Sequence, residues 1–261
     1  MIRTFSDMLG RKVTINYPPK RIVSLVPSQT DLLYDLGLEE EVVGITKFCV
    51  HPDHWHQNKA RVGGTKKLHI DRITELAPDL IIANKEENER EQIETLAGRY
   101  PVWISDIRTL EEALTMIRSV GQLVSKAREA DAITDSIRNG FEELQRSTKL
   151  KRVAYFIWYK PWMTAGRDTF INCMIEALGW ENVMKEDTRY PELSLSELKA
   201  LAPELVLLSS EPFPFQEKHV AELKQELRDT EVKLVDGEMF SWYGSRMLKA
   251  LPYFSKLLSA E

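Results

Sequence analysis

Several features that would assign a function directly are missing from this sequence. No apolar run approaches the roughly 20 residues that a membrane-spanning helix needs, so we do not expect an integral membrane protein. The net charge is −5 over 261 residues, and nucleic acid is not an expected partner because phosphate binding needs a basic surface. No dinucleotide fingerprint, P-loop or nucleophile elbow occurs, and no catalytic triad can be assembled. We therefore expect a non-catalytic protein without a covalent cofactor. We also expect it to be a monomer.

Cysteine is scarce, and a secretory signal is absent from the sequence as written. Cys49 and Cys173 lie one in each half, and their spacing does not support a disulfide, so two free thiols are expected. Residues 1–7 have neither the apolar core nor the small-residue cleavage site of a signal peptide. The sequence as written predicts a cytoplasmic protein, whereas removal of a signal would make it an exported one.

The sequence repeats itself. Residues 76–83, Leu-Ala-Pro-Asp-Leu-Ile-Ile-Ala, recur at 201–208 as Leu-Ala-Pro-Glu-Leu-Val-Leu-Leu. A shorter repeat precedes each of these copies, with Arg-Ile-Val at 21–23 and Arg-Val-Ala at 152–154. Repetition at this distance is too coarse for a solenoid and predicts two similar lobes. Small molecules commonly bind in clefts between domains, so a ligand between the lobes is expected.

Within each half, short apolar strands alternate with helical patterns. The apolar runs at 22–25, 80–83 and 205–208 are typical of strands covered on both faces in a parallel sheet. Ser28 and Ser194 each precede an acidic residue by three positions, which predicts two helix N-termini with capping boxes. The alternation indicates βαβ units and hence an α/β fold with mostly parallel, Rossmann-like sheets.

One predicted helix is longer than the others. Residues 126–148 carry apolar side chains at spacings of three and four along a single stripe. A helix of about 23 residues spans roughly 35 Å, which is long enough to pass from one lobe to another. The expected organisation is an N-terminal lobe over 1–125, a bridging helix over 126–148 and a C-terminal lobe over 149–261.

Polar side chains follow the predicted strands of the first half. Ligands of open α/β sheets bind beyond the carboxyl ends of the strands. The residues at these ends, which we expect to contact polar groups of a ligand, are Ser28 and Gln29 after the first strand, Lys47 after the second, and Asn84 and Lys85 after the third.

Aromatic side chains take these positions in the second half. They are Trp158, Tyr159, Trp162, Phe213, Phe215, Phe240, Trp242 and Tyr243. Aromatic rings that line a cleft can pack against the flat face of a ligand, although some of these rings could instead hold the loops onto their own lobe. The expected ligand contacts in this half are Trp158, Tyr159, Trp162, Met239, Phe240 and Trp242.

Cys49 and His51 lie close to the end of the second predicted strand. Thiolate and imidazole ligands would suit zinc, iron or cobalt. His51 shares what we predict to be a loop with His54 and His56, but the segment has no recognised metal-binding spacing. A cytoplasmic metal-binding protein or metal-dependent enzyme that uses Cys49 and His51 is therefore the alternative function. Both residues are also expected ligand contacts under the first hypothesis.

The order and spacing of several short motifs resemble the substrate-binding proteins of metal-chelate ABC importers, a superfamily of helical-backbone metal receptors. Within it, the sequence is most similar to the cobalamin (vitamin B12) binding branch. The resemblance covers nearly the whole chain but discriminates poorly among corrinoids, haem and ferric siderophores. The motifs are Arg21–Ser28 with a following acidic residue, Val62–Gly64, Leu76–Ile81, Thr164–Arg167, Arg189–Ser194 and Phe240–Arg246.

The resemblance implies a class III periplasmic-binding-protein-like fold: two α/β lobes bridged by one long helix, with a chelate held between them for delivery to an ABC permease. It adds Arg189 to the expected ligand contacts, and it implies a periplasmic location. The branch has an aromatic residue where Asn84 stands. It docks to its permease through one acidic residue per lobe, at positions that hold Arg90 and Ser241 here. The candidate docking residues are therefore the acidic residues around Arg90, which are Glu86, Glu87, Glu89 and Glu91.

Overall fold

A computed structural model describes residues 1–259 and divides the chain into two compact units. Unit 1 comprises 1–107, 111–138 and 243–246, and unit 2 comprises 108–110, 139–242 and 247–261. Each unit has its own parallel sheet, as expected from the repeated sequence. Among residues 1–259, no helix combines the length and apolar character needed to cross a bilayer.

The sheet of unit 1 has five parallel strands in the order β5-β4-β3-β6-β7. Its inner strands are buried at nearly every position, which agrees with their continuous apolar sequences. The strands are β3 (Ile22–Ser24), β4 (Val42–Ile45), β5 (Ala60–Arg61), β6 (Leu80–Asn84) and β7 (Val102–Ser105). The helices between and after them are α1 (Pro27–Asp35), α2 (Asp53–Asn58), α3 (Ile70–Glu75), α4 (Arg90–Ala97) and α5 (Leu110–Leu123).

An antiparallel hairpin precedes this sheet. It consists of β1 (Ile2–Ser6) and β2 (Lys12–Asn16). Val13 and Ile15 point inward from β2, so this strand alternates between buried and exposed side chains as a half-covered strand should. The Trp103 indole N–H donates to the Ser6 carbonyl over 3.2 Å, which fixes the hairpin to β7.

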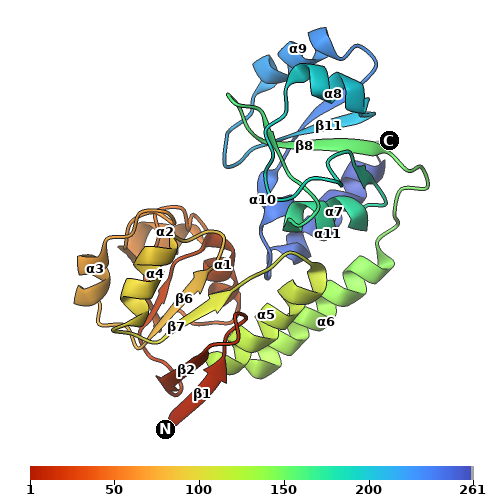
Figure 1. Cartoon of the computed structure of the whole chain (residues 1–261). Coiled ribbons are helices and arrows are strands. Elements are labelled where there is room, and N and C mark those ends of the chain that lie inside the picture. The colour runs from red at the N-terminus through yellow and green to blue at the C-terminus, as the bar shows by residue number, and fades with distance from the viewer. Residues whose placement is uncertain (260–261) are drawn as a thin grey trace. The chain divides into compact units, whose positions relative to one another are not determined.

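The predicted long helix is shorter in the structure. It is α6 (Ala127–Glu143), and it runs beside α5 (Figure 1). A Cβ at Gly121 of α5 would overlap the Cβ of Ala130, so the glycine permits this close approach. The chain leaves the helical path before Ser147, whose hydroxyl bonds to the backbone of Lys149 at 2.9 and 3.3 Å. The division between the two units falls inside α6, after Arg138.

The sheet of unit 2 has the order β10-β8-β11-β12, with β9 antiparallel on β8. Its parallel strands are β8 (Arg152–Trp158), β10 (Glu181–Asn182), β11 (Leu205–Ser209) and β12 (Glu231–Val235), and β9 is Met163–Thr164. The helices are α7 (Phe170–Ala177), α8 (Leu195–Leu201), α9 (Glu217–Glu226), α10 (Gly237–Ser241) and α11 (Met247–Ser259), which contains Pro252. Figure 1 shows α8 and α9 beside the strand β11.

The two Leu-Ala-Pro copies form the same local structure. The alanine of each copy has a left-handed backbone, with φ of 43° and 45°. In the first copy the Asp79 carboxylate accepts the backbone N–H of Arg21 at 2.8 Å. In the second, Glu204 accepts the N–H of Arg152 at 3.0 Å. The repeat therefore fastens the amino end of the first parallel strand of each sheet.

One capping prediction is confirmed and one is wrong. Ser194 and Glu197 form a complete capping box at α8. Ser28 is not a cap, because α1 begins at Pro27 with Val26 as the N-cap, two residues earlier than predicted. Proline is well suited to the first helical position, where the missing N–H is not needed. The predicted loop around His54 and His56 is also wrong, because residues 53–58 form α2.

Candidate functional site

The strand order places a topological switch point in each sheet. In unit 1, β3 continues to β4 on one side and has β6 on the other, and in unit 2 β8 lies between β10 and β11 in the same way. The crevice beyond the carboxyl ends of such strands is where open α/β sheets bind ligands. The segments to consider are therefore those after β3 and β6 in unit 1, and after β8 and β11 in unit 2.

In unit 1, three predicted ligand residues are buried, and two of them bond to a residue of the same unit. Ser28, Gln29 and Asn84 are at most 4% exposed. The Gln29 amide donates to the Ser105 hydroxyl, and the Asn84 amide donates to the same hydroxyl at 3.0 Å. The side-chain amide oxygen of Asn84 accepts the backbone N–H of Glu86 at 2.8 Å. These side chains hold the loops after β3 and β6 in place.

The two predicted lysines of unit 1 are exposed. The Lys47 ammonium lies 4.8 Å from the centre of the Phe48 ring, and that ring is 49% exposed. A Cβ at Gly64 would lie 3.1 Å from the Phe48 ring, so the glycine leaves room for this pair. Lys85 forms an ion pair with Asp106 at 2.6 Å. Lys47 and Phe48 therefore give this edge of unit 1 one cationic and one apolar contact group.

Cys49 lies in an environment that disfavours metal binding. Its side chain is fully buried, and its sulfur lies 3.1 Å from the Thr30 hydroxyl and 3.2 Å from that of Thr46. Burial raises the pKa of the Cys49 thiol, which favours the protonated form over the thiolate that binds metals. Residues 1–259 hold no cluster of three or more potential metal ligands. No observation favours the alternative function that uses Cys49 and His51, of which His51 is partly exposed.

In unit 2, three predicted ligand residues belong to the interior. Met239 and Phe240 lie on α10, Trp242 follows it, and each is at most 8% exposed. The Phe240 ring centre lies 5.1 Å from that of Tyr155 and 5.0 Å from that of Phe254. The Phe240 ring thus fills the space between the sheet and α11, and we expect its role to be structural.

Trp158 behaves differently from these residues. It ends β8 at the switch point and is 41% exposed. The Phe213 ring supports it edge-on, with ring centres 5.8 Å apart and planes at 67°. The rings of Tyr159 and Trp162 pack edge-on with their centres 4.8 Å apart, and both pack against the core of unit 2. The other rings therefore hold Trp158 at the strand end while leaving much of its surface accessible.

His219 completes the packing beneath this aromatic group. Its ring centre lies 4.8 Å from that of Tyr159 and 5.3 Å from that of Phe213. The Nδ1 atom accepts the backbone N–H of Gln216 at 2.9 Å. Burial lowers the pKa of His219, so the neutral ring that can accept this bond is favoured. His219 therefore fixes the start of α9 beneath the Trp158 site.

Glu211 is a functional candidate that sequence reasoning missed. It follows β11 at the switch point, and one carboxylate oxygen accepts the Ser241 hydroxyl and the Trp242 indole N–H, both at 2.7 Å. Burial raises the pKa of Glu211, and the nearby carboxylates of Glu238 and Asp236 raise it further. The only sequence signal was its position after an apolar strand.

We predict that Glu211→Gln stabilises unit 2 at neutral pH. The amide oxygen of glutamine can still accept both hydrogen bonds, and the buried charge is gone. Because the folded pKa of Glu211 lies above its ordinary value of 4.5, the folded state binds the proton more tightly than the unfolded state. The charge therefore costs stability above the folded pKa, and the cost disappears as the pH falls below the unfolded pKa.

Thermal melts followed by circular dichroism test this prediction. We expect the Glu211→Gln variant to melt a few degrees above the parent near pH 7.5, with the difference closing near pH 4.5. The exposed Glu192→Gln is the matched control, for which we expect no such pH-dependent gain. A Glu211→Gln variant that melts below the parent near pH 7.5 would show that the charged hydrogen bonds outweigh the cost of burial.

Arg189 occupies an exposed turn with a left-handed backbone, φ 61°. Its N–H donates to the Asp168 carboxylate, and its carbonyl accepts the N–H of Gly166 at 2.8 Å. The backbone of this residue is therefore fixed, and its side chain extends from a rigid turn of unit 2.

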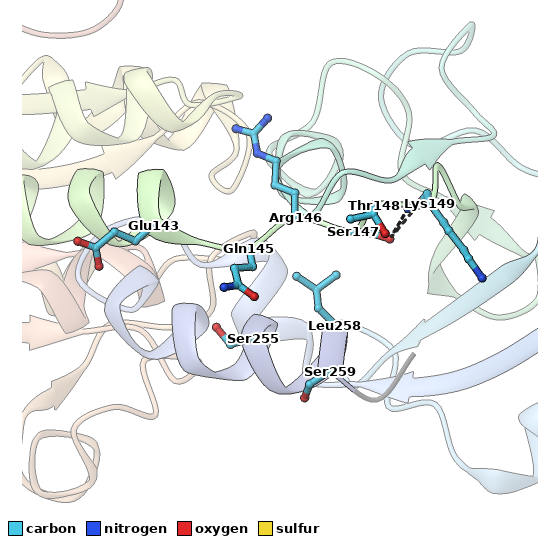
Figure 2. Close-up of a pocket in the computed structure, with 9 residues that line it drawn as sticks. All are labelled: Glu143, Gln145, Arg146, Ser147, Thr148, Lys149, Ser255, Leu258 and Ser259. Carbon is cyan, nitrogen blue, oxygen red and sulfur yellow. Dashed lines mark hydrogen bonds between the residues drawn. The ribbon is translucent and has the colours of Figure 1, made fainter.

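One pocket lies away from both switch points. It measures about 680 Å³ and lies in unit 2 where the chain after α6 meets the end of α11 (Figure 2). Figure 2 shows the side chains of Arg146 and Lys149 pointing in different directions. None of the residues predicted to bind a ligand lines it, and we assign it no function.

Comparisons with known proteins agree with the fold and with the resemblance. A family model described as periplasmic binding protein matches residues 22–233. An ABC transporter substrate-binding lipoprotein of Bacillus subtilis, YvrC, is 26% identical over 215 residues, covering 78% of this chain and 68% of that protein. A vitamin B12-binding protein of Pectobacterium carotovorum is 22% identical over 249 residues, covering 93% and 89%.

Two solved structures share the architecture. The haem-binding protein RhuT from Roseiflexus sp. RS-1 matches with a TM-score of 0.80 at 22% identity, over 92% of this chain and 98% of that one. The vitamin B12-binding protein BtuF of Vibrio cholerae matches with a TM-score of 0.74 at 21% identity, over 93% and 98%. These likenesses confirm the predicted class III periplasmic-binding-protein-like fold with parallel sheets. Together with the family match over most of its length, they place the chain in the periplasmic binding protein family.

Proposed function

We propose that this protein is the solute-binding component of an ABC importer and that it captures a metal chelate. The observation that carries the proposal is Trp158, which stands 41% exposed at the carboxyl end of β8, beside the switch point of unit 2. A large aromatic side chain held open at this position offers a face to a flat, apolar ligand. The family and its relatives named for vitamin B12 and for substrate binding support this role.

Among metal chelates, we propose a corrinoid. Several relatives are named as vitamin B12-binding proteins, and these names support this ligand class. The edge of a corrinoid carries neutral amides, which both donate and accept hydrogen bonds and so suit a site with carboxylate and cationic side chains.

The contact residues that we propose are those whose side chains reach the surface at the strand ends. They are Lys47 and Phe48 in unit 1, and Trp158 in unit 2. The exposed Arg189 and Lys85 could pair with phosphate or carbonyl groups at the edge of the ligand. The buried Ser28, Gln29 and Asn84 would support these contacts by fixing the backbone beneath them.

For permease docking we propose the exposed carboxylates at the start of α4. Glu89 is the N-cap residue of this helix, and Glu91 lies in its first turn. Glu86 and Glu87 are partly buried, and their backbone N–H groups bond to Asn84, so they are less suited to an external partner. A binding protein of an importer acts outside the cytoplasmic membrane, and we propose that location here.

Titration of the purified protein with cyanocobalamin, haemin and a ferric siderophore tests the proposal. We expect cyanocobalamin to quench tryptophan fluorescence and bind with a Kd of about 1 μM or lower, and haemin to bind at least about 10-fold more weakly. Isothermal calorimetry separates binding from inner-filter effects. Absence of binding by all three ligands below about 1 mM would contradict the proposed function. Tighter binding of haemin would contradict only the corrinoid assignment.

A further inference from the structure

A short segment near the C-terminus belongs to the opposite unit from its neighbours in sequence. Residues 243–246 are part of unit 1, whereas 139–242 before them and 247–261 after them are part of unit 2. We call Tyr243–Arg246 the strap. Four residues of fully extended chain span at most about 14 Å, so the strap has little slack.

A buried ion pair holds the strap in unit 1. The Arg246 Nε lies 2.9 Å from the Asp31 carboxylate of α1, and the two side chains are only 5% and 4% exposed. Each charge has been removed from water, and each is compensated by the other. Loss of one partner would therefore remove the compensation that this pair gives to a charge in the interior of unit 1, which is unfavourable.

The other residues of the strap fit closely against α1. Tyr243 is 6% exposed, and its phenol lies beside the hydroxyls of Ser28 and Ser105. Gly244 has φ 101°, a conformation that side chains disfavour. A Cβ at Gly244 would lie 3.2 Å from the Ser28 carbonyl and 3.6 Å from the Leu32 Cβ. The strap thus fills the surface of α1 that the sequence led us to assign to a ligand.

The chain is equally fixed on both sides of the strap. Before it, the Trp242 indole donates to Glu211 at 2.7 Å, which ties this residue to the loop after β11. After it, Met247 is fully buried at the start of α11. A displacement of the strand-end loop of unit 2 would therefore pull directly on a segment that is locked into unit 1.

We propose that the strap is a mechanical link between the units, in addition to α6 and to the segment 108–110, and that the Asp31–Arg246 pair is its lock. The strap restricts the relative motion of the units, and release of the lock frees that motion. The proposal rests on contacts within each unit and on the continuity of the chain. It does not depend on the identity of the ligand.

Hydrogen exchange of the whole protein tests the lock. In Arg246→Met, the buried charge of Asp31 loses this ion pair, and we expect amide exchange in 243–246 to accelerate roughly 100-fold. Exchange in β3, β6 and β11 should remain unchanged. The double variant Asp31→Leu with Arg246→Met contains neither buried charge and should recover most of the protection. Arg118→Met, which removes a partner of the exposed Asp135, is the surface control.

Distances between spin labels test the mechanical role. One label is attached at Glu75→Cys in unit 1 and one at Ala200→Cys in unit 2, both exposed, in a Cys173→Ser background. We expect a broader distance distribution in Arg246→Met than in the parent, and a return to the parent width in the double variant. If the methionine variant fails to fold, Arg246→Lys takes its place, because it keeps the charge and loses the planar fork.

Two outcomes would overturn the proposal. The lock is excluded if exchange in 243–246 is unchanged, or if it rises equally throughout the sheets. The link is excluded if exchange rises in the strap while the distance distribution keeps its width. Neither measurement uses a ligand, so a negative ligand titration leaves this test intact.

Discussion

Truncation of Phe240 to alanine is expected to lower the free energy of unfolding by about 3–5 kcal/mol. The ring is fully buried between Tyr155 and Phe254, so its removal both loses apolar burial and leaves a cavity. The ring belongs to the interior of unit 2, and nothing exposed can take its place. Urea unfolding followed by circular dichroism measures the loss, and the midpoint should fall with little change in the slope.

Leu234→Ala is the matched control for this variant. Leu234 lies on β12 of the same sheet but is 38% exposed, so we expect a change within about 1 kcal/mol. The Phe240 result also decides between two interpretations of the sequence. A Phe240→Ala variant that keeps its stability and loses chelate binding would restore the predicted ligand role of Phe240.

Replacement of Trp158 by alanine is expected to have the opposite profile. If the proposed function is correct, the affinity for the chelate should fall at least about 30-fold, as is common for a central tryptophan of a binding site. The free energy of unfolding should change by no more than about 1 kcal/mol, because much of the side chain is already in water. Isothermal calorimetry is the suitable measurement, since the variant has lost one fluorescent reporter.

Two further variants make the Trp158 result specific. Trp158→Phe keeps an aromatic face and should recover part of the affinity. Tyr34→Ala removes another aromatic side chain of similar exposure, 38%, from the far end of α1, and should leave binding unchanged. Equal losses in Trp158→Ala and Tyr34→Ala would indicate a general effect on the fold and contradict a contact at Trp158.

Much of the fold could be predicted from the sequence because local patterns specify it. The continuous apolar runs of β6 and β11 indicate strands covered on both faces, and the structure confirms them. Ser194 and Glu197 specify their helix start within a span of four residues. The helix α2 was missed because its six residues contain only one buried apolar side chain, Trp55, and so have no measurable period.

The side chains of the candidate site were harder to predict because distant segments decide their burial. Gln29 and Asn84 follow strands in the manner of ligand contacts, yet both donate to Ser105 at the end of another strand. Phe240 and Trp158 are alike in sequence terms. Phe240 is covered by Phe254 from a later helix, whereas Trp158 receives only the edge of Phe213. Which ring is left open depends on tertiary packing that no local pattern records.

The paired Leu-Ala-Pro turns suggest how such a scaffold can diversify. In each unit an acidic residue, Asp79 or Glu204, fastens the amino end of the sheet, at the opposite edge from the strand tips. Sequence change can therefore accumulate at the tips without loosening these fastenings. Related proteins can therefore differ at the strand tips while the amino ends of their sheets stay the same. Proteins named for haem and for vitamin B12 share this architecture at about one fifth sequence identity. This is compatible with a sheet whose fastened ends are distinct from its variable strand tips.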